Sequence, residues 1–192
     1  MKQRDLVLSI IDLCCDRPEF GRTSLQKVAY FVSQGLHQQL GHKAHFYGPF
    51  SEDVEDDVEG LLLAGLIDEK ATSLGFQSYG GDAAKKYEYS MTDAGNERVE
   101  ALRGAYPEEF QSLATFIERL EQAAGGLDQS VLSPAAKTYF IASREHRPVK
   151  TSEIRTFGAQ LGWNLQRKQV LQVVAVLKTL GLVKQSAPAG TS

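Results

Sequence analysis

The chain has 192 residues, of which 42% are hydrophobic and 23% are charged, as is typical of one large or two small globular domains. Its net charge of −3 hides an asymmetry: residues 1–127 carry 12 Lys and Arg against 21 Asp and Glu, and residues 128–192 carry 9 against 3. The two parts, with net charges of −9 and +6, should therefore have different partners.

No apolar run is long enough to span a membrane, and the N-terminus lacks the cleavage site of a signal peptide. The two cysteines, Cys14 and Cys15, are adjacent, and a disulfide between them would strain the backbone. We therefore expect reduced thiols in a cytoplasmic protein with no membrane contact, with Cys14 in the core.

Three helices are predicted in the first part of the chain. Apolar residues at helical spacing cover residues 3–15 and 23–41, and Thr23-x-x-Gln26 fits a capping box for the second helix. After an irregular connection rich in aromatic residues, Ser51 predicts the N-cap of a third helix that ends at Ala64-Gly65.

A β-hairpin should follow these helices. Leu66-Ile67 leads into a polar stretch with several glycines, and residues 87–91 alternate as a return strand. Thr92 then predicts the cap of a fourth helix that ends near Arg103. The order of three helices and a hairpin is that of a winged helix.

The rest of the chain repeats this theme. A helix starts at Pro107, with Phe110, Leu113, Phe116, Ile117 and Leu120 on one face, and Gly125-Gly126 ends it. Ser133-Pro134 and Thr151 predict two further helix starts. A turn that contains Trp163 precedes the last helix, and beyond Lys184 only a short polar tail remains, too little for a full wing.

The predicted fold is therefore mainly α with a small β-hairpin wing: tandem winged-helix or helix-turn-helix-like units joined by a helix. Residues 1–104 form an acidic winged-helix domain and residues 105–127 the connecting helix. Residues 128–192 form a basic winged-helix-like domain with a truncated wing.

Four short motifs in the first domain resemble a known family. They are Gly21-Arg22-Thr23-x-Leu25-Gln26-Lys27-x-x-Tyr30, Tyr47-Gly48-Pro49-Phe50-Ser51, Gly65-Leu66-Ile67 and Tyr89-x-Met91-Thr92-x-x-Gly95. In this order they resemble the YwgA-like family of small prokaryotic winged-helix proteins and, more distantly, the Panacea (SocA-like) antitoxin domain. The first resemblance implies a fold, and the second implies neutralisation of a toxin by direct contact. Neither implies catalytic residues. Panacea-type domains more often have an aliphatic residue at the position of Phe50.

The third helix of the first domain is poorly suited to DNA. Six of the eight residues from Glu52 to Glu59 are carboxylates, which phosphates would repel. This helix is either a solvated acidic face or a protein-binding surface, and a metal site on it is the weaker alternative. The candidate partner-binding residues are Tyr47, Phe50, Glu52 and Asp56, although the two aromatic rings are also suited to packing on the core.

The second domain carries the residue types that suit DNA. Arg and Lys can bind guanine edges, Gln can bind adenine edges, and all three can bind phosphate. The candidates are Arg144, Arg147, Lys150, Arg155, Gln166, Arg167 and Lys168. The alternative is that they are ordinary solvated charges.

No signature of an enzyme occurs, neither a phosphate-binding loop nor a metalloprotease or nucleophile motif, so we expect no catalytic activity and no cofactor. The cluster of His37, His42 and His45 lacks a familiar zinc spacing, and we interpret these residues as surface or packed histidines, without a metal.

Two hypotheses follow. In the first, the protein is a prokaryotic transcriptional regulator whose basic C-terminal unit binds double-stranded DNA, while the acidic unit binds a protein or forms a homodimer. In the alternative, it is an antitoxin- or adaptor-type protein that binds a toxin or another protein, and DNA has no role. We expect Trp163, which precedes the last helix, to report DNA binding through its fluorescence.

Overall fold

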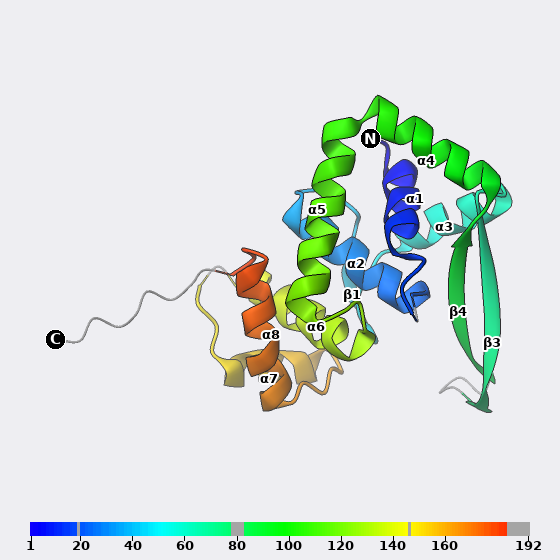
Figure 1. Ribbon diagram of the computed structural model, residues 1–192. Helices are drawn as coiled ribbons and strands as arrows, with labels where there is room; N and C mark the ends of the chain where they lie inside the picture. The colour runs from blue at the N-terminus through cyan, green and yellow to red at the C-terminus, as the bar shows by residue number, and fades with distance from the viewer. Residues whose placement is uncertain (19, 78–82, 146, 184–192) are drawn as a thin grey trace.

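The computed structural model in Figure 1 describes residues 1–18, 20–77, 83–145 and 147–183. Within them the chain forms eight helices and two antiparallel hairpins, which confirms a mainly helical fold with a small β wing. In chain order the elements are α1 (Gln3–Cys14), α2 (Arg22–Gly35), β1 (Lys43–His45), β2 (Gly48–Phe50), α3 (Glu52–Leu63), β3 (Ile67–Gln77), β4 (Ala83–Met91), α4 (Asp93–Ala105), α5 (Pro107–Ala124), α6 (Gln129–Arg144), α7 (Thr151–Gln160) and α8 (Arg167–Thr179).

The wing is the β3–β4 hairpin, which projects from the side of the molecule (Figure 1). Its strands pair from Ile67 opposite Met91 outwards, and Ile67 is buried at the base. At the start of α2, the guanidinium of Arg22 donates two hydrogen bonds of 2.7 Å to Glu69 and lies 3.8 Å from the centre of the Tyr87 ring. These contacts hold the wing against α2.

Two predicted N-caps are confirmed. The hydroxyl of Ser51 accepts a hydrogen bond of 3.1 Å from the Val54 N–H, and that of Thr92 accepts one of 3.0 Å from the Gly95 N–H. Each bond satisfies an N–H group that has no partner within its own helix. The starts of α3 and α4 are thus fixed by local sequence.

Helix α2 differs from the prediction at both ends. It begins directly after Gly21, so Thr23-x-x-Gln26 is no capping box, and it ends at Gly35, before the predicted end. The side-chain amide of Gln26 donates to the Ser51 carbonyl and accepts from the Ser51 N–H, both at 2.9 Å. Because Gln26 is buried, its amide needs internal partners, and the backbone at the start of α3 provides them.

The predicted irregular connection before Ser51 contains a short hairpin. Strands β1 and β2 pair antiparallel around a turn formed by Phe46 and Tyr47, with His45 opposite Gly48. Gly48 has φ = 110°, a value that residues with a Cβ rarely adopt. Pro49 donates no ladder hydrogen bond, and three-residue strands give too little alternation to be recognised.

The predicted starts of two later helices are wrong. Helix α6 begins at Gln129, where Asp128 caps it, and Pro134 lies within the helix and not at its first position. In α7, Thr151 is the first helical residue and not the cap. The Glu153 carboxylate accepts a hydrogen bond of 2.8 Å from the Lys150 N–H and so satisfies the end of this helix. We expect residues 128–192 to have only a truncated wing after the last helix. This prediction falls on residues 184–192, which lie outside the described part of the chain.

Helix α5 has the predicted apolar face and lies across α2. The five residues Phe110, Leu113, Phe116, Ile117 and Leu120 are all buried, which confirms that face. A Cβ on Gly35 would lie 2.0 Å from the Phe116 ring, so only glycine permits this close approach of α2 and α5.

Helices α6 and α8 pack against the preceding elements, and α7 packs against both of these helices. Helix α6 contacts α2 and β2, and α8 contacts α5. Trp163, in the turn between α7 and α8, is only 1% exposed, and its ring lies 5.6 Å from that of Phe140. The indole N–H donates a hydrogen bond of 2.7 Å to the His45 carbonyl in β1. Trp163, which we expect to report DNA binding through its fluorescence, is therefore a core residue.

The division at residues 104 and 127 remains a prediction. Buried residues from α1 to α8 form one hydrophobic cluster, so the segments on either side of α5 share a core. Independent folding of the C-terminal segment would remove the Tyr30 ring from beside Phe140 and the His45 carbonyl from the indole of Trp163.

We expect Trp163→Phe to lower the free energy of unfolding by about 1–3 kcal/mol, because the His45 carbonyl loses its donor and part of the buried ring volume is lost. Urea unfolding of the full chain, followed by far-ultraviolet circular dichroism, measures this change. The control Leu171→Ala removes a side chain that is 53% exposed and should change stability by less than about 0.5 kcal/mol. Equal stability of Trp163→Phe and the unmodified protein would contradict this role of the indole.

Candidate functional site

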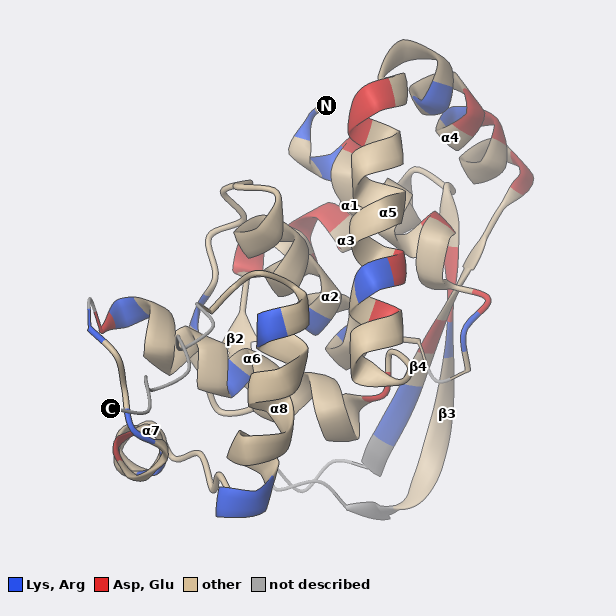
Figure 2. Ribbon diagram, turned by 60° about the vertical axis from the view of Figure 1, so that its left-hand side comes forward, with Lys and Arg blue, Asp and Glu red and all other residues tan. Residues whose placement is uncertain are grey.

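The exposed face of α8 lacks negative charge. Val170, Val173 and Leu177 are buried and fix which face of the helix meets the core. The opposite face begins with Arg167 and Lys168, both exposed, and α8 contains no Asp or Glu. Neither cation forms an ion pair with any residue that the structure describes. Figure 2 shows these cations at the first turn of α8, at the bottom of the view.

The turn before α8 brings two further predicted residues to the same place. The Arg155 guanidinium of α7 donates a hydrogen bond of 3.2 Å to the Leu165 carbonyl. Gln166, at the N-cap position of α8, donates through its side chain to Asn164 at 2.8 Å. Arg155, Gln166, Arg167 and Lys168 therefore form one group, which we call the α8 cationic end.

Two of the three other predicted DNA-binding residues have side-chain contacts of their own. Arg147 forms an ion pair of 2.8 Å with Glu153, and the hydrogen bond to that carboxylate raises the pKa of Arg147. The Arg144 guanidinium lies 4.3 Å from the centre of the Phe140 ring. Lys150 is exposed. Of these three, Arg147 is already neutralised by a neighbouring carboxylate.

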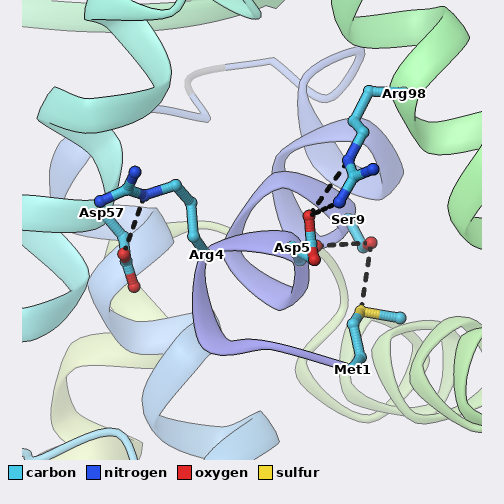
Figure 3. Close-up of polar contacts among 6 residues, drawn as sticks. All are labelled: Met1, Arg4, Asp5, Ser9, Asp57 and Arg98. Carbon is cyan, nitrogen blue, oxygen red and sulfur yellow. Dashed lines mark hydrogen bonds and ion pairs between the residues drawn. The ribbon is translucent and has the colours of Figure 1, made fainter.

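Most of the acidic side chains of α3 face solvent. Five of its six carboxylates are exposed, and Figure 2 shows them away from the α8 cationic end. The sixth, Asp57, is buried and accepts hydrogen bonds from Gln3 at 2.8 Å and from Arg4 at 3.2 Å. Figure 3 shows Arg4 of α1 reaching Asp57 and Arg98 reaching Asp5 on another side of the same helix. Asp57 therefore has a structural role.

The predicted partner-binding residues differ in exposure. Tyr47 is 57% exposed at the tip of the β1–β2 hairpin, whereas Phe50 is half-buried with its ring 5.0 Å from that of His45. Glu52 and Asp56 are exposed on α3, and Glu52 lies 3.9 Å from the Lys43 ammonium. Of these two predicted aromatic residues, Tyr47 therefore faces solvent and Phe50 packs against the hairpin.

A cavity of about 640 Å³ lies between α2, α3, the β1–β2 hairpin and β4. Tyr47 and Phe50 line it, but the carboxylates in its wall are Glu55 and Glu59, and not Glu52 or Asp56. The sequence contains a pattern that distinguishes Glu55 and Glu59 from Glu52 and Asp56. Glu55, Val58, Glu59 and Leu62 share one helix face at i, i+3, i+4 and i+7, but only the tertiary structure shows what that face meets.

Lys27 is a buried cation beneath this cavity. It is 1% exposed, and its ammonium donates a hydrogen bond of 2.9 Å to the Pro49 carbonyl. Burial, together with the nearby charge of Lys137, lowers the pKa of Lys27 to about 8. Sequence reasoning missed this residue, because a lysine within an amphipathic pattern is usually solvent-exposed.

The histidines and cysteines do not form a metal site in the described part of the chain, where no three His, Cys, Asp or Glu side chains are grouped to hold an ion. Cys14 and Cys15 are free, and Cys14 is buried in the core as predicted. Burial raises the pKa of the Cys14 thiol to about 12 and so disfavours the reactive thiolate.

No protein-family model matches the chain, and no curated protein matches it either. Among the helices that the structure describes, none has both the length and the apolar content needed to cross a bilayer.

Burial of His42 predicts a pH-dependent stability. Burial lowers its pKa from 6.5 to about 4, so between these values the unfolded chain binds a proton that the folded chain does not. Stability should therefore fall as the pH falls through this window, by up to about 2 kcal/mol between pH 7 and 5. Urea unfolding at both pH values measures this loss.

The variant His42→Phe should lose less stability over the same interval, because it has no group to protonate there. The control His37→Asn alters an exposed histidine and should retain the loss seen in the unmodified protein. An equal loss in His42→Phe and the unmodified protein would assign the effect to other groups.

Proposed function

We propose that this protein is a DNA-binding regulator that contacts duplex DNA through α7, the following turn and α8. The observation that carries the proposal is the α8 cationic end: four cationic or amide side chains gather at the start of a helix whose exposed face has no carboxylate. In helix-turn-helix proteins the N-terminal residues of the second helix meet base edges in the major groove.

The chemistry of this end suits both parts of DNA recognition. Arg167 and Lys168 can bind phosphates or guanine edges, and Gln166 can bind adenine edges. The N–H groups of the first turn of α8 add an electrostatic preference for phosphate. Arg155, bonded to the Leu165 carbonyl, supports the turn and brings a further positive charge beside it.

The N-terminal winged helix supports a different role in this proposal. Five exposed carboxylates on α3 would repel phosphates, so the helix that usually reads DNA in such a unit is unsuited to it. In the regulator this unit serves for regulation, or for contact with a protein or a second copy of the chain. The prokaryotic winged-helix resemblance is compatible with that assignment.

The alternative is an antitoxin- or adaptor-type protein that binds a partner protein and not DNA. The exposure of Phe46 and Tyr47, each 57%, favours it, because exposed aromatic rings are common anchors of protein interfaces. This alternative predicts no measurable affinity of the full chain for duplex DNA at about 50 mM salt.

A titration of an end-labelled duplex with the full chain, followed by fluorescence anisotropy, decides between the two functions. We expect binding at about 50 mM salt that weakens steeply as salt rises, because cations on the protein release counterions from the DNA. Arg167→Glu with Lys168→Glu should weaken binding at least ~10-fold and reduce the slope of log K against log salt by about 2.

The matched control is Lys2→Glu with Lys178→Glu, which makes the same change in net charge away from the α8 cationic end. It should weaken binding far less. If both double variants lose affinity equally, the attraction is only that of the overall charge. If the unmodified chain does not bind at all, the regulator is excluded.

A further inference from the structure

The cavity between α2, α3 and the β1–β2 hairpin has one aromatic wall. The rings of His45, Tyr47 and Phe50 line it from the hairpin, with centroids 5.0 Å apart for His45 and Phe50 and 6.1 Å apart for His45 and Tyr47. Leu25 of α2, with Val58 and Leu62 of α3, adds aliphatic surface. These side chains offer an apolar body a large contact area.

The accessible charge of the cavity is negative. Glu55 and Glu59, one helical turn apart on α3, are both exposed, and neither forms an ion pair with a residue in the described part of the chain. The cations in the wall are engaged elsewhere: Arg22 holds Glu69 with two hydrogen bonds of 2.7 Å, and Lys27 is covered and holds the Pro49 carbonyl. The two carboxylates are thus the charges left for a ligand.

We propose that this cavity binds a small lipophilic cation, with its apolar body against His45, Tyr47 and Phe50 and its positive charge beside Glu55 and Glu59. Aromatic faces attract cations as well as apolar groups, so both features of the wall favour the same ligand. The volume of about 640 Å³ lies in the range of small-molecule sites.

The hairpin also connects this cavity to the α8 cationic end. Tyr47 and Phe50 face the cavity, while the carbonyl of His45 accepts the hydrogen bond of Trp163 in the turn before α8. A ligand that moves the hairpin would therefore act on the position of that turn. This role as an effector site rests on the proposed function, whereas binding of the cation itself does not.

The test uses the full chain without DNA, so that its outcome is independent of DNA binding. Isothermal titration calorimetry with tetraphenylphosphonium, a lipophilic cation, should show one site per chain. Tetraphenylborate has nearly the same shape and the opposite charge, and it should bind at least roughly tenfold more weakly, because Glu55 and Glu59 repel it. Equal affinity for the two ions would overturn the proposal.

Two variants locate the site. Glu55→Gln with Glu59→Gln should weaken tetraphenylphosphonium binding roughly tenfold, because both compensating charges are lost. The control Asp53→Asn with Glu97→Gln removes two exposed carboxylates outside the cavity and should leave the affinity unchanged. Tyr47→Ala removes a largely exposed ring and should also weaken binding, which keeps the test decisive if the Glu variant does not fold.

A final titration separates a small ligand from a segment of a protein. The capped tripeptide acetyl-Leu-Arg-Leu-amide carries the same combination of apolar groups and one positive charge. Weaker binding of the peptide than of tetraphenylphosphonium supports the proposal. Tighter binding, with the same dependence on Glu55 and Glu59, would overturn it and assign the cavity to a basic segment of a partner protein.

Discussion

The burial of the central ten residues of α2 is the constraint on which the rest of the structure depends. Every residue from Ser24 to Ser33 is buried, including polar side chains that require internal partners. Gln26 finds them on the backbone of Ser51, and Lys27 finds one on Pro49. These bonds fix the positions of the β1–β2 hairpin and the start of α3. In the hairpin, the His45 carbonyl then accepts a hydrogen bond from the indole of Trp163. One buried helix thereby positions both the cavity and the turn before α8.

Among the residues that the structure describes, no ion pair joins the acidic part of the chain to the basic part. The contact between them includes the Phe140 ring, 6.2 Å from that of Tyr30, and the indole of Trp163, which donates to the His45 carbonyl. No ion pair in the described part of the chain joins α3 to α8, and five of the six carboxylates of α3 and the cations at the start of α8 stay exposed. Each charged helix thus remains accessible to a partner of its own, which would not be the case if α3 and α8 neutralised one another.

Sequence patterns predicted helix starts well where a cap acts within one turn, and failed where a polar side chain has a distant partner. Ser51 and Thr92 cap their own helices, so their motifs were sufficient. Gln26 fits the sequence pattern of a capping box, yet its side-chain amide binds the backbone of Ser51, 25 residues away. The error at α6 had another cause: Asp128 and Ser133-Pro134 are both possible local start signals, and the helix begins at the first and continues through Pro134. A local motif does not show which of two possible partners or start signals the folded chain uses.

The sequence by itself determined the mainly helical fold with a hairpin wing, the apolar face of α5 and the exposed cations at the start of α8, because periodicity and charge are properties of neighbouring residues. Only the tertiary structure decided that Trp163 is buried, that Asp57 binds Arg4, and that Glu55 and Glu59, not Glu52 and Asp56, face the cavity. The physical reason is the same for each. These environments are created by segments far apart in the chain, and burial and ion pairing depend on which surfaces meet.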